Sequence, residues 1–139
     1  MILHFNYEEL RALADAGEAF VAEGAHGGAV AAPPEGMAKV ERLLPRLTGD
    51  LSVETLEEQR RIRDAVALIV GGVHERMDDR LIEYTPGHEE AVNLYFEYGH
   101  ARTVLARLDR MGAEMEAILE LIGGTRGVSD LASTVTFPD

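Results

Sequence analysis

The sequence of 139 residues contains no cysteine, which excludes disulfides, iron–sulfur clusters, thiolate zinc sites and cysteine nucleophiles. It has only 13 Lys and Arg against 25 Asp and Glu, a formal net charge of −12 at pH 7. Binding to phosphate backbones needs a clustered positive surface, so we expect no nucleic-acid partner. No apolar run approaches the roughly 20 residues that span a bilayer, so we expect no membrane partner either.

Motifs of common catalytic and cofactor sites are also scarce. Serine occurs at three positions, one that suits a helix cap and two near the C-terminus. The glycine-rich stretch 123–127 lacks the lysine and the preceding strand of a phosphate-binding loop. We therefore expect no catalytic residue and no cofactor. The first residues have no basic region and too short an apolar stretch for a signal peptide, which favours a cytoplasmic location.

What is present suits one globular domain. Hydrophobic residues make up 46% of the chain and charged residues 27%, enough for a core and a solvated surface. We place a single domain at 1–124. Within it, the segment 24–34 is rich in glycine and proline and is expected to be a flexible linker. The tail 125–139 has a different composition and is expected to be extended or to dock elsewhere.

Two shorter helices are predicted in the N-terminal part. Asn6 and Glu9 have the spacing of a capping box, and the apolar residues that follow predict a helix over about 7–23. A second helix is predicted over about 35–47, with Pro45 expected to kink or end it.

Two long helices are predicted after them. The first covers about 52–84, with Ser52 or Asp50 as its cap, and the second covers about 86–122. Thr85-Pro86 separates them by almost no loop, so they must form an antiparallel hairpin. The predicted fold is an all-α bundle in which the two shorter helices lie end to end along this hairpin.

The second long helix carries more apolar surface than one partner helix needs. Val104, Met111 and Ile118 repeat every seven residues beside its main apolar stripe. We interpret this flank as the surface through which the chain forms a dimer or a larger homo-oligomer. A non-enzymatic assembly protein, with a further protein partner as an option, is the first functional hypothesis.

A metal site is the alternative hypothesis. Glu97 and His100 form a Glu-x-x-His pair, which is half of the ligand set of carboxylate-bridged di-metal bundles, and the hairpin register places His74 at the level of Tyr98. These three residues are the candidate ligands for a divalent metal or a small ligand in a ferritin-like bundle. Helical phase argues against an interior site, because Tyr98 and Ala101 occupy the inward direction.

Three further features are left open by the sequence. Gly71-Gly72 lies within a helix and indicates close packing, a kink or a small pocket. The aromatic cluster at 95–98 is suited to seal the bundle, anchor a partner or border a pocket. The β-prone ends at 2–5 and 133–137 could pair with each other or with another chain, and the tail 131–137 could dock on a partner.

Overall fold

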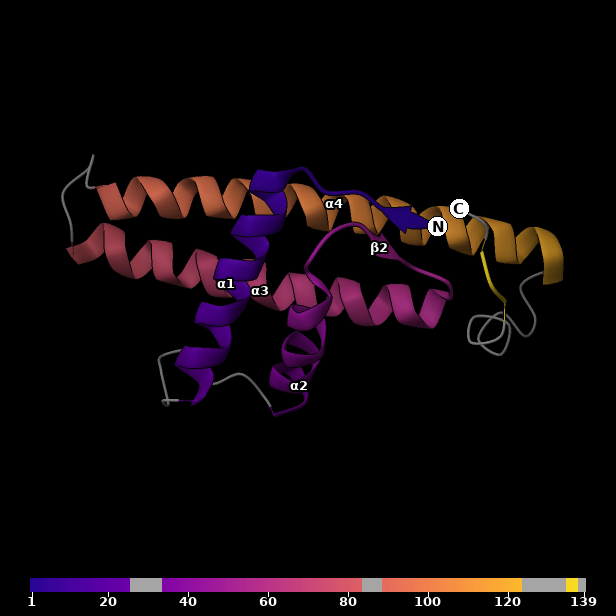
Figure 1. The fold of residues 1–139 in the computed structure, drawn as a ribbon, viewed down its shortest axis with the longest axis horizontal. Coiled ribbons are helices and arrows are strands. Elements are labelled where there is room, and N and C mark those ends of the chain that lie inside the picture. The colour runs from indigo at the N-terminus through magenta and orange to yellow at the C-terminus, as the bar shows by residue number, and fades with distance from the viewer. Residues whose placement is uncertain (26–33, 84–88, 124–134, 138–139) are drawn as a thin grey trace.

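The protein is an all-α bundle, as the sequence predicts. The computed structural model describes residues 1–25, 34–83, 89–123 and 135–137. Figure 1 shows a long antiparallel hairpin with two shorter helices packed against one side of it. The described helices are α1 (Tyr7–Ala25), α2 (Pro34–Leu43), α3 (Leu56–Glu83) and α4 (Glu89–Gly123). Of the predicted linker at 24–34, the ends belong to α1 and α2, which run to Ala25 and from Pro34, and residues 26–33 lie outside the described residues. The predicted cap at Thr85-Pro86 lies outside them as well.

The start of α1 follows directly from its first residues. The backbone N–H of Glu9 donates to Asn6 Oδ1 at 2.8 Å, and the backbone N–H of Asn6 donates to Glu9 Oε1 at 3.0 Å. These two bonds confirm the predicted capping box, which satisfies donors that the first turn leaves unpaired. The predicted effect of Pro45 is also confirmed, because α2 gives way at Leu44 to the short 3₁₀ helix η1 (Leu44–Arg46).

The hairpin has the predicted register. The rings of His74 on α3 and Tyr98 on α4 lie with their centroids 5.7 Å apart. Further along, Arg63 Nε donates to Asp109 Oδ1 at 2.9 Å. Because both contacts join residues whose numbers add to nearly the same value, the two helices stay in one register along the hairpin.

The start of α3 differs from the prediction. Neither Ser52 nor Asp50 caps the helix, which begins at Leu56 with the hydroxyl of Thr55 accepting the backbone N–H of Glu58 at 3.1 Å. Ser52 lies instead in a strand, and Asp50 Oδ1 accepts the backbone N–H of Phe5 at 3.1 Å. The reason is a long-range pairing that local helix signals do not contain: β1 (Ile2–Leu3) pairs antiparallel with β2 (Leu51–Ser52).

The two short helices do not lie end to end along the hairpin. Figure 1 shows that α1 crosses it steeply, with α2 beside it. At the start of α1, Glu9 Oε1 accepts a hydrogen bond from Arg107 of α4 at 2.6 Å. Near its end, Phe20 packs so closely on α3 that a Cβ at Gly72 would come within 3.0 Å of its ring. These two contacts hold α1 across both hairpin helices, so it cannot run along either one.

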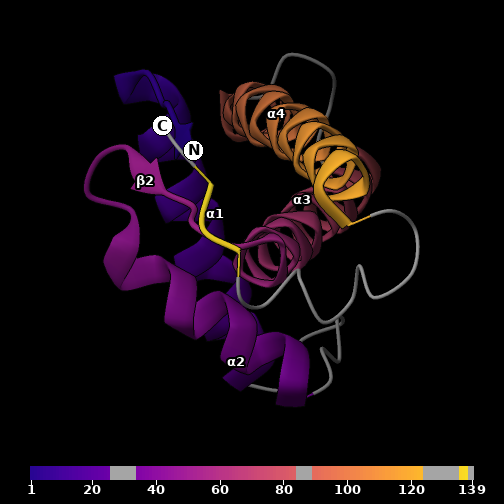
Figure 2. The same cartoon turned by 90° about the vertical axis from the view of Figure 1, so that its right-hand side faces the viewer.

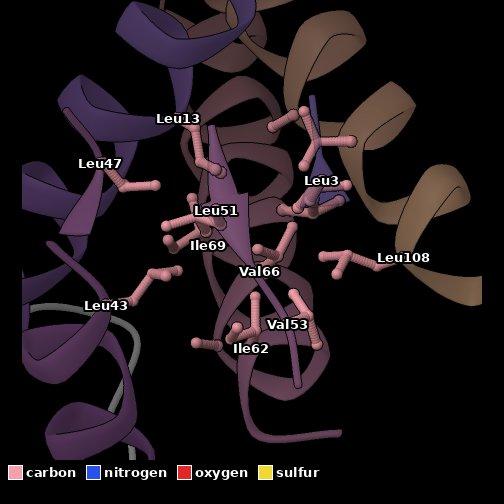
Figure 3. Close-up of a cluster of buried hydrophobic side chains, with 14 of the residues drawn as sticks. Leu3, Leu13, Leu43, Leu47, Leu51, Val53, Ile62, Val66, Ile69 and Leu108 are labelled. Atoms are coloured by element: carbon pink, nitrogen blue, oxygen red, sulfur yellow. The ribbon is translucent and has the colours of Figure 1, made fainter. Parts of the chain in front are cut away.

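The core lies where α1, α3, α4 and the small sheet meet. Figure 3 shows Leu13, Ile69, Leu3 and Leu108 converging from these four parts, and all are nearly inaccessible to solvent. The tail adds Phe137, which is buried in the same core. Its backbone N–H donates to Glu54 O at 2.9 Å, and its carbonyl accepts from the Met1 ammonium group at 3.3 Å. Met1 and Phe137 therefore meet beside the sheet.

Candidate functional site

Two of the three candidate metal ligands line one groove, and the third lies elsewhere on the hairpin. His74 is exposed on α3, with its Nδ1 3.6 Å from Asp78 Oδ2. His100 lines a groove of about 300 Å³ between α1 and α4, which Tyr7 and Phe96 also border. Glu97 lines the same groove.

Glu97 is held by a cation of the chain itself. Its Oε1 accepts a hydrogen bond from Arg76 Nη2 of α3 at 3.0 Å, and both side chains are largely buried. Burial raises the pKa of the Glu97 carboxyl. The attraction of Arg76 opposes that rise, and the nearby negative charge of Asp15 adds to it. Among the described residues, Arg76 Nε is a buried nitrogen without a hydrogen-bond partner.

Glu97 is therefore paired with Arg76. In the described part of the chain, neither candidate histidine is its hydrogen-bond or ion-pair partner. Within the same residues, no group of three or more His, Asp or Glu side chains is arranged to hold a metal ion. The chemistry of this region is that of a partly buried ion pair which joins α3 to α4.

The flank predicted as an interface is mostly inside the chain. Val104 and Met111 belong to the core and are 0% and 8% exposed, and Ile118 is partly buried against it. Met111 also lines a groove with the residues of β1. The extra apolar width of α4 is thus largely buried within the chain, at Met111 beside the N-terminal residues, and these side chains have little surface left for a second subunit.

A different face of α4 is apolar and open to solvent. Val92, Tyr95 and Phe96 are 41%, 51% and 65% exposed. At 100° per residue they lie opposite Ala101, which is fully buried in the core. The same face continues through three small exposed residues. We call the whole set the outer face, and its members are Val92, Tyr95, Phe96, Gly99, Thr103 and Ala106.

The outer face has few polar atoms that need water. The hydroxyl of Thr103 donates to the carbonyl oxygen of Gly99 at 2.9 Å, so it can leave water without losing its partner. A Cβ placed on Gly99 would meet no atom within 4 Å. In Figure 2, no described element covers the side of α4 that faces away from α3 and α1. The outer face reaches the edge of the groove between α4 and α1, where Phe96 lies.

Sequence reasoning named the aromatic cluster but missed the face to which it belongs. The signal is a second helical series at 92, 95–96, 99, 103 and 106, with spacings of three and four. It is inconspicuous because half of its members are small, and because the main stripe of the same helix is more strongly apolar.

Comparison with known proteins finds no match for this chain among protein-family models, curated proteins or solved structures. Of the helices described here, none combines the length and the apolar character that a membrane crossing requires. The functional conclusion therefore depends on the geometry of the chain itself.

Proposed function

We propose that this chain is a non-enzymatic assembly protein that self-associates through the outer face of its helix hairpin. The observation that carries the proposal is the exposure of Val92, Tyr95 and Phe96 on successive turns of one helix. Scattered exposed apolar residues are normal, but a contiguous set of large ones marks an interaction surface. Aromatic residues are also enriched in the centres of protein interfaces.

The size of the face suits a helix as its partner. From Val92 to Ala106 it extends over about 21 Å at 1.5 Å per residue. Burying a large apolar side chain completely contributes roughly 1.5–3 kcal/mol, whereas association costs at least about 4 kcal/mol in lost freedom. One such side chain is not enough, but a symmetric dimer buries three from each copy.

The hairpin supplies a rigid support for this surface. On the opposite side of α4, Ala101 packs in the core, and the Arg76–Glu97 ion pair fastens α4 to α3 at the level of the aromatic residues. A preorganised surface loses little conformational entropy on binding. Two hairpins that meet through their outer faces would together form a four-helix arrangement. We place this assembly in the cytoplasm, in keeping with the expectation from the sequence.

The direct test changes the most exposed aromatic residue of the face. Phe96→Asp puts a charge where the proposed interface would exclude water, so we expect the dimer to dissociate while helicity is retained. Light scattering coupled to gel filtration measures the mass, and circular dichroism measures the helicity.

A matched control makes the same kind of substitution in the same helix at a position outside the outer face. Leu121→Asp also replaces an exposed apolar residue of α4, more than four turns from the centre of the outer face. It should leave the mass unchanged. A Phe96→Asp variant that assembles like the natural protein would refute the proposed surface.

A further inference from the structure

The outer face is asymmetric along its length. Its large residues, Val92, Tyr95 and Phe96, all precede Gly99, and its small residues, Thr103 and Ala106, all follow it. Gly99 thus separates a bulky half from a shallow half. A surface of this kind complements a copy of itself only when that copy runs in the opposite direction.

Antiparallel pairing about Gly99 matches two of the three large residues with small ones and sets the third, Phe96, at the level of Arg102 of the second copy. A two-fold axis at this position sets each residue opposite the one equally far beyond the glycine. Val92 then faces Ala106 of the second copy, and Tyr95 faces Thr103. Parallel pairing would instead place Phe96 against Phe96 and would leave the small halves facing each other across a gap, which is costly because interfaces pack as densely as interiors.

Charges at the two ends of the face favour the same direction. Glu89 lies at the start of α4 and Arg110 lies one turn beyond Ala106, and both are exposed. Antiparallel copies about Gly99 set Glu89 of each opposite Asp109 of the other with Arg110 one residue beyond, whereas parallel copies would set Glu89 against Glu89. The neighbouring Asp109 is already paired with Arg63 of α3, so it does not cancel Arg110 at this level.

In the described part of the chain, no contact at Gly99 requires glycine. A side chain there would meet nothing within 4 Å, and glycine in a helix is about 1 kcal/mol less favourable than alanine. Glycine at this position would allow the backbone of a second helix to come close, because small residues let helices approach each other.

From these three observations we propose that the partner is a second copy of this chain, bound with its α4 antiparallel about a two-fold axis at Gly99. This inference depends on the proposed self-association, and it adds the orientation and the register. Each copy contributes the same surface, so the assembly closes as a dimer and does not extend into a filament.

The absence of cysteine makes disulfide cross-linking a clean test of the register. A disulfide needs Cα atoms about 4.4–6.8 Å apart, so only residues that face each other will form one. We compare Val92→Cys alone, Ala106→Cys alone and an equal mixture of the two under mild oxidation. The mixture should yield a covalent dimer of one chain of each kind, and each variant alone should remain uncross-linked.

The outcomes separate the two proposals. Cross-linking of each single variant with itself would show a parallel pair, and a dimer that never cross-links would show another register. Both results overturn the inference but leave self-association intact. A natural protein that is monomeric by light scattering overturns the proposed function as well.

A charge exchange tests the orientation without introducing cysteine. Glu89→Arg and Arg110→Glu should each weaken the dimer, raising its Kd by about fivefold, as expected for exposed ion pairs that become repulsive. The double variant restores both pairs, so its Kd should return to within about twofold of the natural value. Equal or additive weakening in the double variant would contradict antiparallel pairing.

Discussion

At the scale of single residues, the glycines inside helices differ in what surrounds them. Gly72 allows Phe20 of α1 to approach, in agreement with the close-packing interpretation of this position, although the sequence could not reveal that the partner comes from α1. Gly112 accommodates the amide of Gln59, whose Nε2 donates to Leu108 O at 2.6 Å. Gly71 is exposed and has open space where a side chain would be.

These differences predict opposite effects of the same substitution. Gly71→Ala should raise the free energy of unfolding by up to about 1 kcal/mol, because it improves helix propensity and meets no atom. Gly112→Ala should lower it, because its Cβ would lie 2.8 Å from Gln59 Nε2 and displace a buried hydrogen bond, at a cost of about 1–3 kcal/mol. Urea unfolding of the two variants measures both. An equal gain in stability from both would contradict the packing described at Gly112.

At the scale of elements, local signals were readable in the sequence and distant partners were not. The capping box at Asn6 uses residues three apart, and the hairpin register follows from the short connection predicted at Thr85-Pro86, so both could be predicted. The strand at Leu51–Ser52 needs a partner about 50 residues away, and no periodic pattern reveals it. In the same way, the pattern of α4 shows which faces are apolar but does not show which of them the N-terminal part covers.

The ion pair of Arg76 and Glu97 between α3 and α4 makes the free energy of unfolding depend on pH in a predictable direction. Burial raises the pKa of Glu97 above its value in the unfolded chain, so the folded state binds this proton more tightly. The stabilisation from protonation is complete below the unfolded pKa, near 4.5, and is lost as pH rises through the folded pKa. Between neutral pH and about pH 4.5, acidification should therefore favour the natural protein relative to Glu97→Gln, which does not titrate.

The comparison with the glutamine variant isolates this group from the other carboxyls. Hydrogen bonds lower the pKa of Asp50, which therefore responds to acid in the opposite direction, but it is present in both proteins and cancels. Urea unfolding at pH 7 and at pH 5 measures the difference. A natural protein that loses stability relative to Glu97→Gln on acidification would show that the attraction of Arg76 outweighs burial.

At the scale of the whole molecule, net charge opposes the proposed assembly. Each copy carries a formal charge of −12, so two copies repel each other at long range. Salt reduces this repulsion, since the Debye length falls from about 30 Å at 0.01 M to about 8 Å at 0.15 M. Salt also weakens the attraction between Glu89 of one copy and Arg110 of the other, but exposed ion pairs contribute only about 0–1 kcal/mol each.

We therefore expect the dimer to tighten several-fold when the salt concentration rises from 0.01 M to 0.15 M. The variant with both Glu89→Arg and Arg110→Glu has the same net charge and should respond in the same way. Sedimentation velocity at a series of concentrations gives the Kd at each salt. Weakening of the natural dimer on added salt would indicate that local ion pairs, and not apolar burial, hold it together.

The central claim is that the outer face of α4 joins two copies of this chain, and its most direct test is the mass of the natural protein in solution. Sedimentation equilibrium at 0.15 M salt and micromolar concentration should give twice the mass of one chain, and Phe96→Asp should give the mass of one chain. A natural protein that sediments as a monomer throughout this range would contradict the claim.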